Sequence, residues 1–298
     1  MRILRFSGVA LIAALLLQAC ATVNLPAITD SPTNLRLPGK VVWHDLITDN
    51  PKASERFYSE LFGWEFESVG SSFGLGSDST YTLIRHNGRL IGGMVDERKL
   101  NVSGDISQWM PLLSVANIQI AATRVKTDGG KVLTPPTELA DRGWLAVVED
   151  KQGALMALVQ TRDGDPVDRE PSWGDFLWDE LWTNDVDEAA QFYSDLFGYD
   201  KVMRVLDDDH TYNVLNHQGK PRAGLLKRPI PELAPVWVAY IRVEDTDAVL
   251  ARVEELGGRI LLGSRERDIG GTVALIAGPS GAGIAIQTWD KDLMERAQ

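Results

Sequence analysis

Apolar and polar residues alternate with two periods along this chain, and the succession of periods predicts strands and helices in a repeated order. Val41–Thr48 mixes β-branched and aromatic residues, which is typical of a strand. Ala53, Phe57, Leu61 and Phe62 then recur at helical spacing. Three short strands are predicted next, near Trp64–Val69, Thr80–His86 and Arg89–Val95.

The ends of the predicted helix carry their own signals. Asp49 or Asn50 precedes Pro51, which is the arrangement of an N-cap followed by proline at the first helical position. Gly63 stands where a helix-terminating glycine is expected.

The same order then restarts within the first half of the chain. Met110–Ala116 is predicted to be a strand, and Ile118–Thr127 a helix that ends at Gly129 and Gly130. Further strands are predicted near Lys131–Leu133, Trp144–Glu149 and Ala154–Gln160. The first half therefore reads as a βαβββ module written twice.

The second half repeats the first. SERFYSELFGWEF, from Ser54, corresponds to AAQFYSDLFGYDK, from Ala189, and Phe57 and Phe192 are 135 positions apart. VVWHDLITDN and FLWDELWTND align at the same offset without a gap. Self-similarity over this length indicates two copies of one domain. We predict an α+β protein with domains at 39–161 and 173–290, a polar linker at 162–172 and a short tail at 291–298.

The extreme N-terminus has the pattern of a targeting segment. Arg2 and Arg5 precede an apolar stretch over 6–17, and L-Q-A-C, ending at Cys20, resembles a bacterial lipobox. Cys20 is the one cysteine of the chain, so no disulfide can form within a monomer. We expect residues 1–19 to be a signal peptide and Cys20 to be lipidated. Cleavage after Ala21, or retention as a short uncleaved anchor, are the alternatives.

This prediction implies a membrane partner and an extracytoplasmic location. Residues 20–38 contain three prolines and read as a lipidated cysteine followed by an extended tether. Ala21, rather than aspartate, after the cysteine favours the outer membrane if the host is Gram-negative. The formal net charge of −12 argues against a nucleic-acid partner, since such binding depends on Lys and Arg contacts to phosphates.

The paired βαβββ modules, the FY-x-x-LFGW helix end and the D-x-x-G turn before a last strand resemble the vicinal oxygen chelate superfamily. That superfamily includes glyoxalase I, extradiol dioxygenases and bleomycin-resistance proteins. The resemblance covers about Gly39–Gln160 and Gly174–Asp290. It implies that each domain is a half-open, eight-stranded barrel made from two modules. It does not specify a reaction, because fold does not determine chemistry.

The resemblance also implies where a divalent metal would be bound, by His and Glu side chains at the barrel centre. The corresponding positions hold Trp43 and Trp178 on the first strands, Met110 and Val238 on the fifth, and Ala157 and Ala285 on the eighth. The fourth strands, RLIGGMV and PRAGLLK, contain neither His nor Glu. None of these side chains supplies the donors that such a metal requires. We therefore predict no cofactor and disfavour a divalent metal.

The histidines of the chain are weaker candidates for metal ligands. A slip of one residue would make His44 a metal ligand, although such a shift exchanges the two faces of the strand. His86 and His217 precede Asn-Gly and Gln-Gly pairs, so we expect exposed turn residues. His210 lies in an acidic run and is expected in a solvated loop.

An acid flanked by tryptophan is repeated on the predicted inward face of each first strand. Trp43 and Asp45 share a face in the first domain, as Trp178, Glu180 and Trp182 do in the second. Trp109 and Trp237 neighbour the fifth-strand ligand positions and are also assigned to the candidate ligand pocket. From the sequence, they could lie on either face of their strands.

Three interpretations of this face are open. Aromatic walls and a carboxylate suit a planar or cationic small molecule. The tryptophans could instead simply fill the barrel. Asp45 and Glu180, with pKa values raised by burial, are candidate general bases.

We therefore expect a lipid-anchored, tandem-domain protein that binds a small aromatic or cationic molecule without a catalytic metal. The alternatives are a lyase, isomerase or dioxygenase with an unusual metal set or a carboxylate base, and a structural or interaction protein of the cell envelope. Whether the protein is an enzyme is open at this point, with the balance against it.

Overall fold

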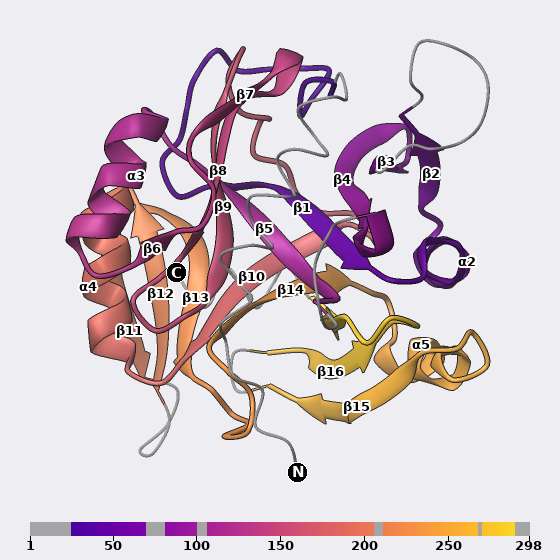
Figure 1. Cartoon of the computed structure of the whole chain (residues 1–298). Coiled ribbons are helices and arrows are strands. Elements are labelled where there is room, and N and C mark those ends of the chain that lie inside the picture. Colours follow the sequence, from indigo (N-terminus) through magenta and orange to yellow (C-terminus); the bar gives the residue numbers. More distant parts are fainter. Residues whose placement is uncertain (1–24, 70–80, 100–105, 206–210, 268–269, 290–298) are drawn as a thin grey trace.

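A computed structural model describes residues 25–69, 81–99, 106–205, 211–267 and 270–289. Two mixed sheets pack against each other, with helices at both ends of the assembly (Figure 1). The predicted signal peptide, Cys20 and His210 lie outside the described residues.

The first domain contains nine strands and two α-helices in its described part. The elements are β1 (Val41–Thr48), α2 (Pro51–Phe62), β2 (Glu65–Ser68), β3 (Tyr81–His86), β4 (Arg89–Asp96), β5 (Gln108–Ser114), α3 (Ile118–Thr127), β6 (Lys131–Val132), β7 (Thr137–Leu139), β8 (Gly143–Glu149) and β9 (Leu155–Thr161). Two short 3₁₀ turns, Glu97–Lys99 and Ala140–Arg142, complete it.

The second domain repeats this order with eight described strands. Its elements are β10 (Phe176–Thr183), α4 (Val186–Phe197), β11 (Asp200–Val205), β12 (Thr211–His217), β13 (Lys220–Lys227), β14 (Val236–Arg242), α5 (Thr246–Val253), β15 (Arg259–Glu266), β16 (Thr272–Ala277) and β17 (Gly283–Gln287).

Each domain builds its sheet from its own two modules. The strand orders are β2-β3-β4-β1-β5-β9-β8-β6, with β7 beside β8, and β11-β12-β13-β10-β14-β17-β16-β15. The modules meet where β1 pairs antiparallel with β5, and where β10 pairs with β14. The ends of each sheet do not pair with each other, so the predicted half-open α+β architecture is confirmed.

The helix boundaries follow the predicted signals. The Asn50 side chain accepts from the Ala53 amide at 3.3 Å, so Asn50 is the N-cap of α2. Gly63 ends the helix with φ = 72°, a left-handed conformation that costs glycine little. Asp185 and Gly198 do the same for α4.

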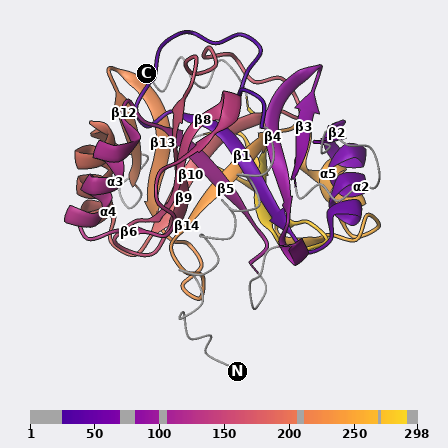
Figure 2. The same cartoon turned by 45° about the horizontal axis from the view of Figure 1, so that its top comes forward.

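The repeated Phe-Tyr phrase packs between the domains. Phe57 and Tyr58 are buried in a cluster that also contains Ile241 and Ile276 of the second domain. A second cluster combines α3 and β8 with α4, β12 and β13. Helices α2 and α5 therefore lie side by side at one end, and α3 and α4 at the other (Figures 1 and 2).

The opposite face of each sheet, called the inner face below, points away from these helices and carries its own apolar cluster. Trp43, Met110 and Ala157 belong to this cluster in the first domain. Val238 and Ala285 belong to it in the second. The strand register used to assign these positions from sequence is thus confirmed, and Asp45 lies opposite Met110 as Glu180 lies opposite Val238.

The segment that precedes the first domain covers its inner face. Leu25 and Ile28, only 1% and 4% exposed, join the inner cluster of the first domain. This closes a surface that would otherwise expose Trp43, which is 1% exposed.

The same segment is hydrogen-bonded to the interdomain linker. The Thr33 amide donates to Asp165 O at 3.0 Å, and the Asn34 amide to Asp163 O at 3.1 Å. The Leu37 amide donates to the Asp165 carboxylate at 2.6 Å. Residues 25–38, expected as a tether, are instead a packed strap on the first domain, because their apolar residues find an uncovered sheet face.

Truncation of the strap should therefore destabilise the protein. Leu25→Ala removes a fully buried side chain and should lower the free energy of unfolding by about 2–5 kcal/mol. Leu35→Ala, in the same strap but at a residue 61% exposed, is the matched control and should change it by no more than about 0.5 kcal/mol. Urea unfolding measures both, and equal effects would contradict the packed strap.

Candidate functional site

His44 lies on the interdomain face of β1, opposite the inner face. Its Nε2 is 2.8 Å from Asp179 Oδ1, and its ring stacks on Phe176 with 3.8 Å between centroids. His44 and Asp179 are the same position of the two copies, 135 residues apart. Among the described residues, no group of three or more His, Cys, Asp or Glu side chains could hold a metal. The alternative of His44 as a barrel ligand is therefore wrong, because its ring faces the other domain.

The centre of the inner face in the second domain is the Glu180 carboxylate, which is fully buried. Its Oε1 accepts from the Tyr212 hydroxyl at 2.7 Å and from Arg267 Nη2 at 2.6 Å. Its Oε2 accepts from Trp182 Nε1 at 3.2 Å and from the Tyr240 hydroxyl. Four donors from four strands or strand ends converge on one carboxylate.

These donors determine the charge of Glu180. Burial alone would raise the pKa of its carboxyl, but the Arg267 guanidinium and the hydrogen bonds from Tyr240 and Tyr212 outweigh it and hold the pKa below its ordinary value. Burial and the neighbouring carboxylate raise the pKa of both tyrosines, so they remain protonated donors. The expectation of a raised pKa at Glu180 is wrong for this reason.

The first domain has a related but simpler centre. Asp45 Oδ1 accepts from Trp43 Nε1 at 2.9 Å and from the Tyr81 hydroxyl at 2.6 Å. Arg142 Nη1 donates to the same hydroxyl at 2.8 Å, and its guanidinium carbon lies 4.4 Å from the centroid of the Trp43 ring. Arg142 Nε also reaches Pro26 O in the strap, at 3.4 Å.

A glycine on the fourth strand makes room for each tyrosine hydroxyl. A Cβ on Gly93 would lie 2.0 Å from the Tyr81 hydroxyl oxygen, and one on Gly224 would lie 2.0 Å from that of Tyr212. Both positions therefore require glycine, and the tyrosine–acid contact is built into both copies.

Trp109 and Trp237 do not belong to this face, which corrects their assignment to the ligand pocket. Trp109 donates to the Tyr58 hydroxyl at 2.9 Å, and Trp237 to the Tyr193 hydroxyl at 3.0 Å. Each is buried beneath the helix that carries its tyrosine. One-residue alternation along β5 and β14 explains this, because Met110 and Val238 point inward.

The inner faces do not fit the divalent metal that the fold suggests. The ligand positions hold indole, thioether and aliphatic side chains. The carboxylate near each centre is already hydrogen-bonded to a tyrosine, and the guanidinium of buried Arg142 or half-buried Arg267 lies beside it. A second cation there would be repelled by Arg142 or Arg267.

Sequence reasoning missed the donors to these acids. Tyr81 and Tyr212 could have been found, because both stand in the repeated Thr-Tyr pair at the start of the third strand. Arg142 and Arg267 could not be found from the repeat, since one directly precedes Gly143 and the other lies four residues before the equivalent Gly271.

The two turn histidines also differ from expectation. His86 is buried, and its Nδ1 lies 2.7 Å from Asp175 Oδ1. Arg89 donates to both oxygens of the same aspartate, at 2.9 and 2.7 Å. His86 is thus an interdomain contact rather than an exposed turn residue, and His217 is half-buried.

Stability should depend on pH through Glu180. Because the folded-state pKa is depressed, its stabilising contribution is present above the ordinary glutamate value of about 4.3 and is lost as pH falls through the folded pKa. Glu180→Gln leaves the Arg267 guanidinium, whose side chain is only 12% exposed, without its counter-charge and should cost about 3–5 kcal/mol at pH 7.

The difference between wild type and Glu180→Gln should begin to narrow below the ordinary glutamate value of about 4.3, because the unfolded wild-type chain then takes up a proton that folded Glu180, with its lowered pKa, still resists. Urea unfolding at pH 7, 4 and 3 measures it, with Glu255→Gln at an exposed position as control. A difference that stays constant with pH would contradict an ionised Glu180.

Comparison with known proteins agrees with this architecture. Residues 176–286 match the profile of the Glyoxalase/Bleomycin resistance protein/Dioxygenase superfamily. The putative glyoxylase CFP32 of Mycobacterium tuberculosis is 26% identical over 240 residues, which cover 80% of this chain and 91% of that protein. The anthracycline biosynthesis protein DnrV of Streptomyces peucetius is 27% identical over 266 residues, covering 84% and 93%.

A solved structure shows the same fold across both domains. The Mn(II)-bound glyoxalase from Novosphingobium aromaticivorans superposes with a TM-score of 0.56 at 16% identity, covering 85% of this chain and 83% of that one. Residues 176–286 thus match a domain of the glyoxalase/bleomycin resistance protein/dioxygenase superfamily, and the first domain repeats the strand order of the second.

Proposed function

We propose that this protein binds a planar aromatic molecule with an oxygen acceptor on the inner face of its second domain, and that it holds the molecule without a catalytic metal. The observation that carries the proposal is an unpaired amide group on Gln287, a residue that is 1% exposed. Its Oε1 accepts from Arg267 Nη1 at 2.8 Å, whereas its Nε2 is buried without a partner among the described residues. An unpaired buried donor costs about 1–3 kcal/mol, and a ligand oxygen would remove that cost.

The surroundings of Gln287 define the rest of the ligand. Gln287 lies on β17 two residues beyond Ala285, which places both on the inner face. Trp178, half-buried, and Trp182 line the same face and suit an aromatic ring. Arg267 neutralises Glu180, so the site has no spare negative charge for a cation. An aromatic ligand is therefore favoured over a cationic one.

The two domains differ at the positions that matter for this proposal. Where the second domain has donor side chains, the first has aliphatic ones. The equivalent pairs are Trp182 and Ile47, Tyr240 and Leu112, and Gln287 and Val159. The strap also covers the first inner face. The first domain therefore has a structural role in this proposal, and the second binds.

The geometry gives less support to an enzyme that uses Glu180 as a base. A general base needs a free lone pair and a pKa near the working pH. Glu180 already accepts four hydrogen bonds and has a lowered pKa. The Glu180 carboxylate is better suited to orienting Tyr212 and Tyr240 than to removing a proton.

The relatives support an aromatic ligand. DnrV is named for the biosynthesis of anthracyclines, which are polycyclic aromatic ketones. Another similar structure is described as the 2,3-dioxygenase LapB. CFP32 is described only as a putative glyoxylase. An aromatic ring carrying oxygen is the chemistry that agrees with Gln287 and the tryptophan walls.

The proposed location is extracytoplasmic, with the chain held at a membrane by acylated Cys20 and, in a Gram-negative host, at the outer membrane. The support is the sequence pattern around Cys20. Within the described part of the chain, none of the helices combines the length and the apolar character needed to span a bilayer.

Ligand binding can be tested with a matched pair of probes. 9-Fluorenone and fluorene have the same planar shape, and only fluorenone has a carbonyl oxygen. We expect fluorenone to quench tryptophan fluorescence saturably and to bind about five- to tenfold more tightly, the worth of one hydrogen bond. Gln287→Leu should abolish this preference, whereas Gln119→Leu, at an exposed position, should preserve it.

Two outcomes of that titration would overturn the proposal. Equal binding of the two probes would contradict recognition through Gln287. The absence of a saturable response to either would favour a structural or interaction role for the second domain.

The anchor is tested separately. Cys20→Ser should abolish incorporation of labelled palmitate and release the protein from the membrane fraction. Fluorescence titration of the released protein should be unchanged, because the proposed binding face lies in the second domain. Retention of Cys20→Ser in washed membranes would contradict lipid anchoring.

A further inference from the structure

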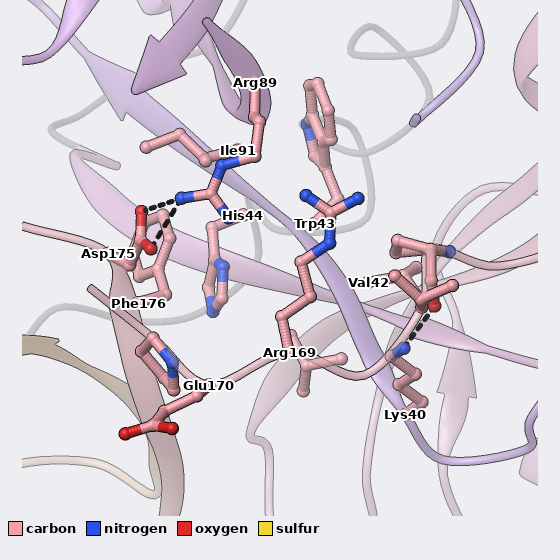
Figure 3. A pocket seen from close by; sticks show the side chains of 14 residues that line it. Lys40, Val42, Trp43, His44, Arg89, Ile91, Arg169, Glu170, Asp175 and Phe176 are labelled. Carbon is pink, nitrogen blue, oxygen red and sulfur yellow. Dashed lines mark hydrogen bonds and ion pairs between the residues drawn. The ribbon is translucent and has the colours of Figure 1, made fainter. Parts of the chain in front are cut away.

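A pocket lies between the two domains, apart from the inner face of the second domain. Its volume is about 200 Å³. It is lined by the start of β1, by β4, by linker residues 166–171 and by the start of β10 (Figure 3). None of the residues around Glu180 or Gln287 contributes to it.

The charges that line this pocket are predominantly positive. Lys40, Arg89 and Arg169 are opposed by Asp175 and Glu170. This local excess stands out on a chain whose net charge is −12. A positive pocket on an acidic protein attracts small anions and discriminates against cations.

The acids of the pocket are already engaged. Asp175 accepts from Arg89, from the His86 ring and from the Ser172 amide. The Glu170 carboxylate lies 3.7 Å from Arg242. These carboxylates are therefore not free to neutralise a further guanidinium.

The arginines retain unused donors. Arg89 donates through Nη2 alone among the contacts within the described residues. Arg169 has neither a hydrogen bond nor an ion pair to any described residue, and its side chain reaches into the pocket toward Trp43 (Figure 3). Lys40 differs, because it is tied to Asp168 at 2.8 Å and to Pro166 O. A planar guanidinium with free donors matches the two oxygens of a carboxylate.

The remaining wall is apolar. Phe176 stacks on the His44 ring, and Ile91 and Val42 are among the other apolar residues that line the pocket. A pocket of this size accommodates a small ring or a branched chain beside the charged group.

We propose that this interdomain pocket binds a small organic carboxylate, whose two oxygens are held by Arg169 with Arg89 and whose apolar body lies against Phe176. The pocket combines residues of the first domain, the linker and the second domain. A bound carboxylate would therefore also stabilise the pairing of the domains, in proportion to its concentration relative to Kd.

Isothermal titration calorimetry with benzoate tests this, with benzamide as the neutral molecule of the same shape. Benzoate should bind with one-to-one stoichiometry and benzamide at least tenfold more weakly. Arg169→Gln should weaken benzoate binding at least tenfold without changing the urea midpoint of the unliganded protein, since Arg169 makes no ion pair to any described residue. Arg56→Gln, at another exposed arginine, is the matched control and should bind as wild type does.

Three results would overturn the proposal: benzamide binding as tightly as benzoate, Arg169→Gln binding benzoate as wild type does, or inorganic phosphate binding in place of benzoate. Gln287→Leu separates this site from the aromatic site of the second domain. Benzoate binding that survives Gln287→Leu belongs to the interdomain pocket, and benzoate binding that is lost with it does not.

Discussion

The contact between His44 and Asp179 joins the same position of two copies, and the arrangement of the whole molecule is organised around it. Both side chains are buried, so separating the domains would leave each polar group without its partner as well as expose the shared apolar clusters. Each helix packs beside a helix of the other domain. The two sheets therefore share their apolar clusters. The inner faces take no part in this interface, so their side chains can differ between the two domains.

Those inner faces have become unlike despite a common backbone. Both retain the tyrosine–acid contact and the glycine that makes room for it. The first face is completed by aliphatic residues and the strap, which makes it a core. The second is completed by aromatic and amide donors around an ion pair, which makes it a polar site within apolar walls. Chemical difference between repeats, rather than their likeness, thus locates the candidate function.

Most of the fold could be predicted because it depends on local patterns. Alternation placed Trp43 and Asp45 on one face and His44 on the other, and Asn50 and Gly63 marked the helix ends. What the sequence did not reveal depends on contacts between distant segments. Arg267 reaches Glu180 across 87 positions in the sequence, and Arg142, which has the related role in the first domain, stands at a different position of the repeat. Leu25 and Ile28 look like ordinary apolar residues of a spacer until the uncovered sheet face is known.

The strap has a consequence for how the protein would stand at a membrane. With Cys20 acylated, only four residues separate the anchor from Leu25, which is packed into the first domain, and the five steps along the chain from Cys20 to Leu25 span at most about 18 Å. The first domain would then be held close against the lipid headgroups, with little freedom to swing. The linker would hold the second domain to the same body, so its proposed binding face would keep a constant orientation toward the aqueous compartment.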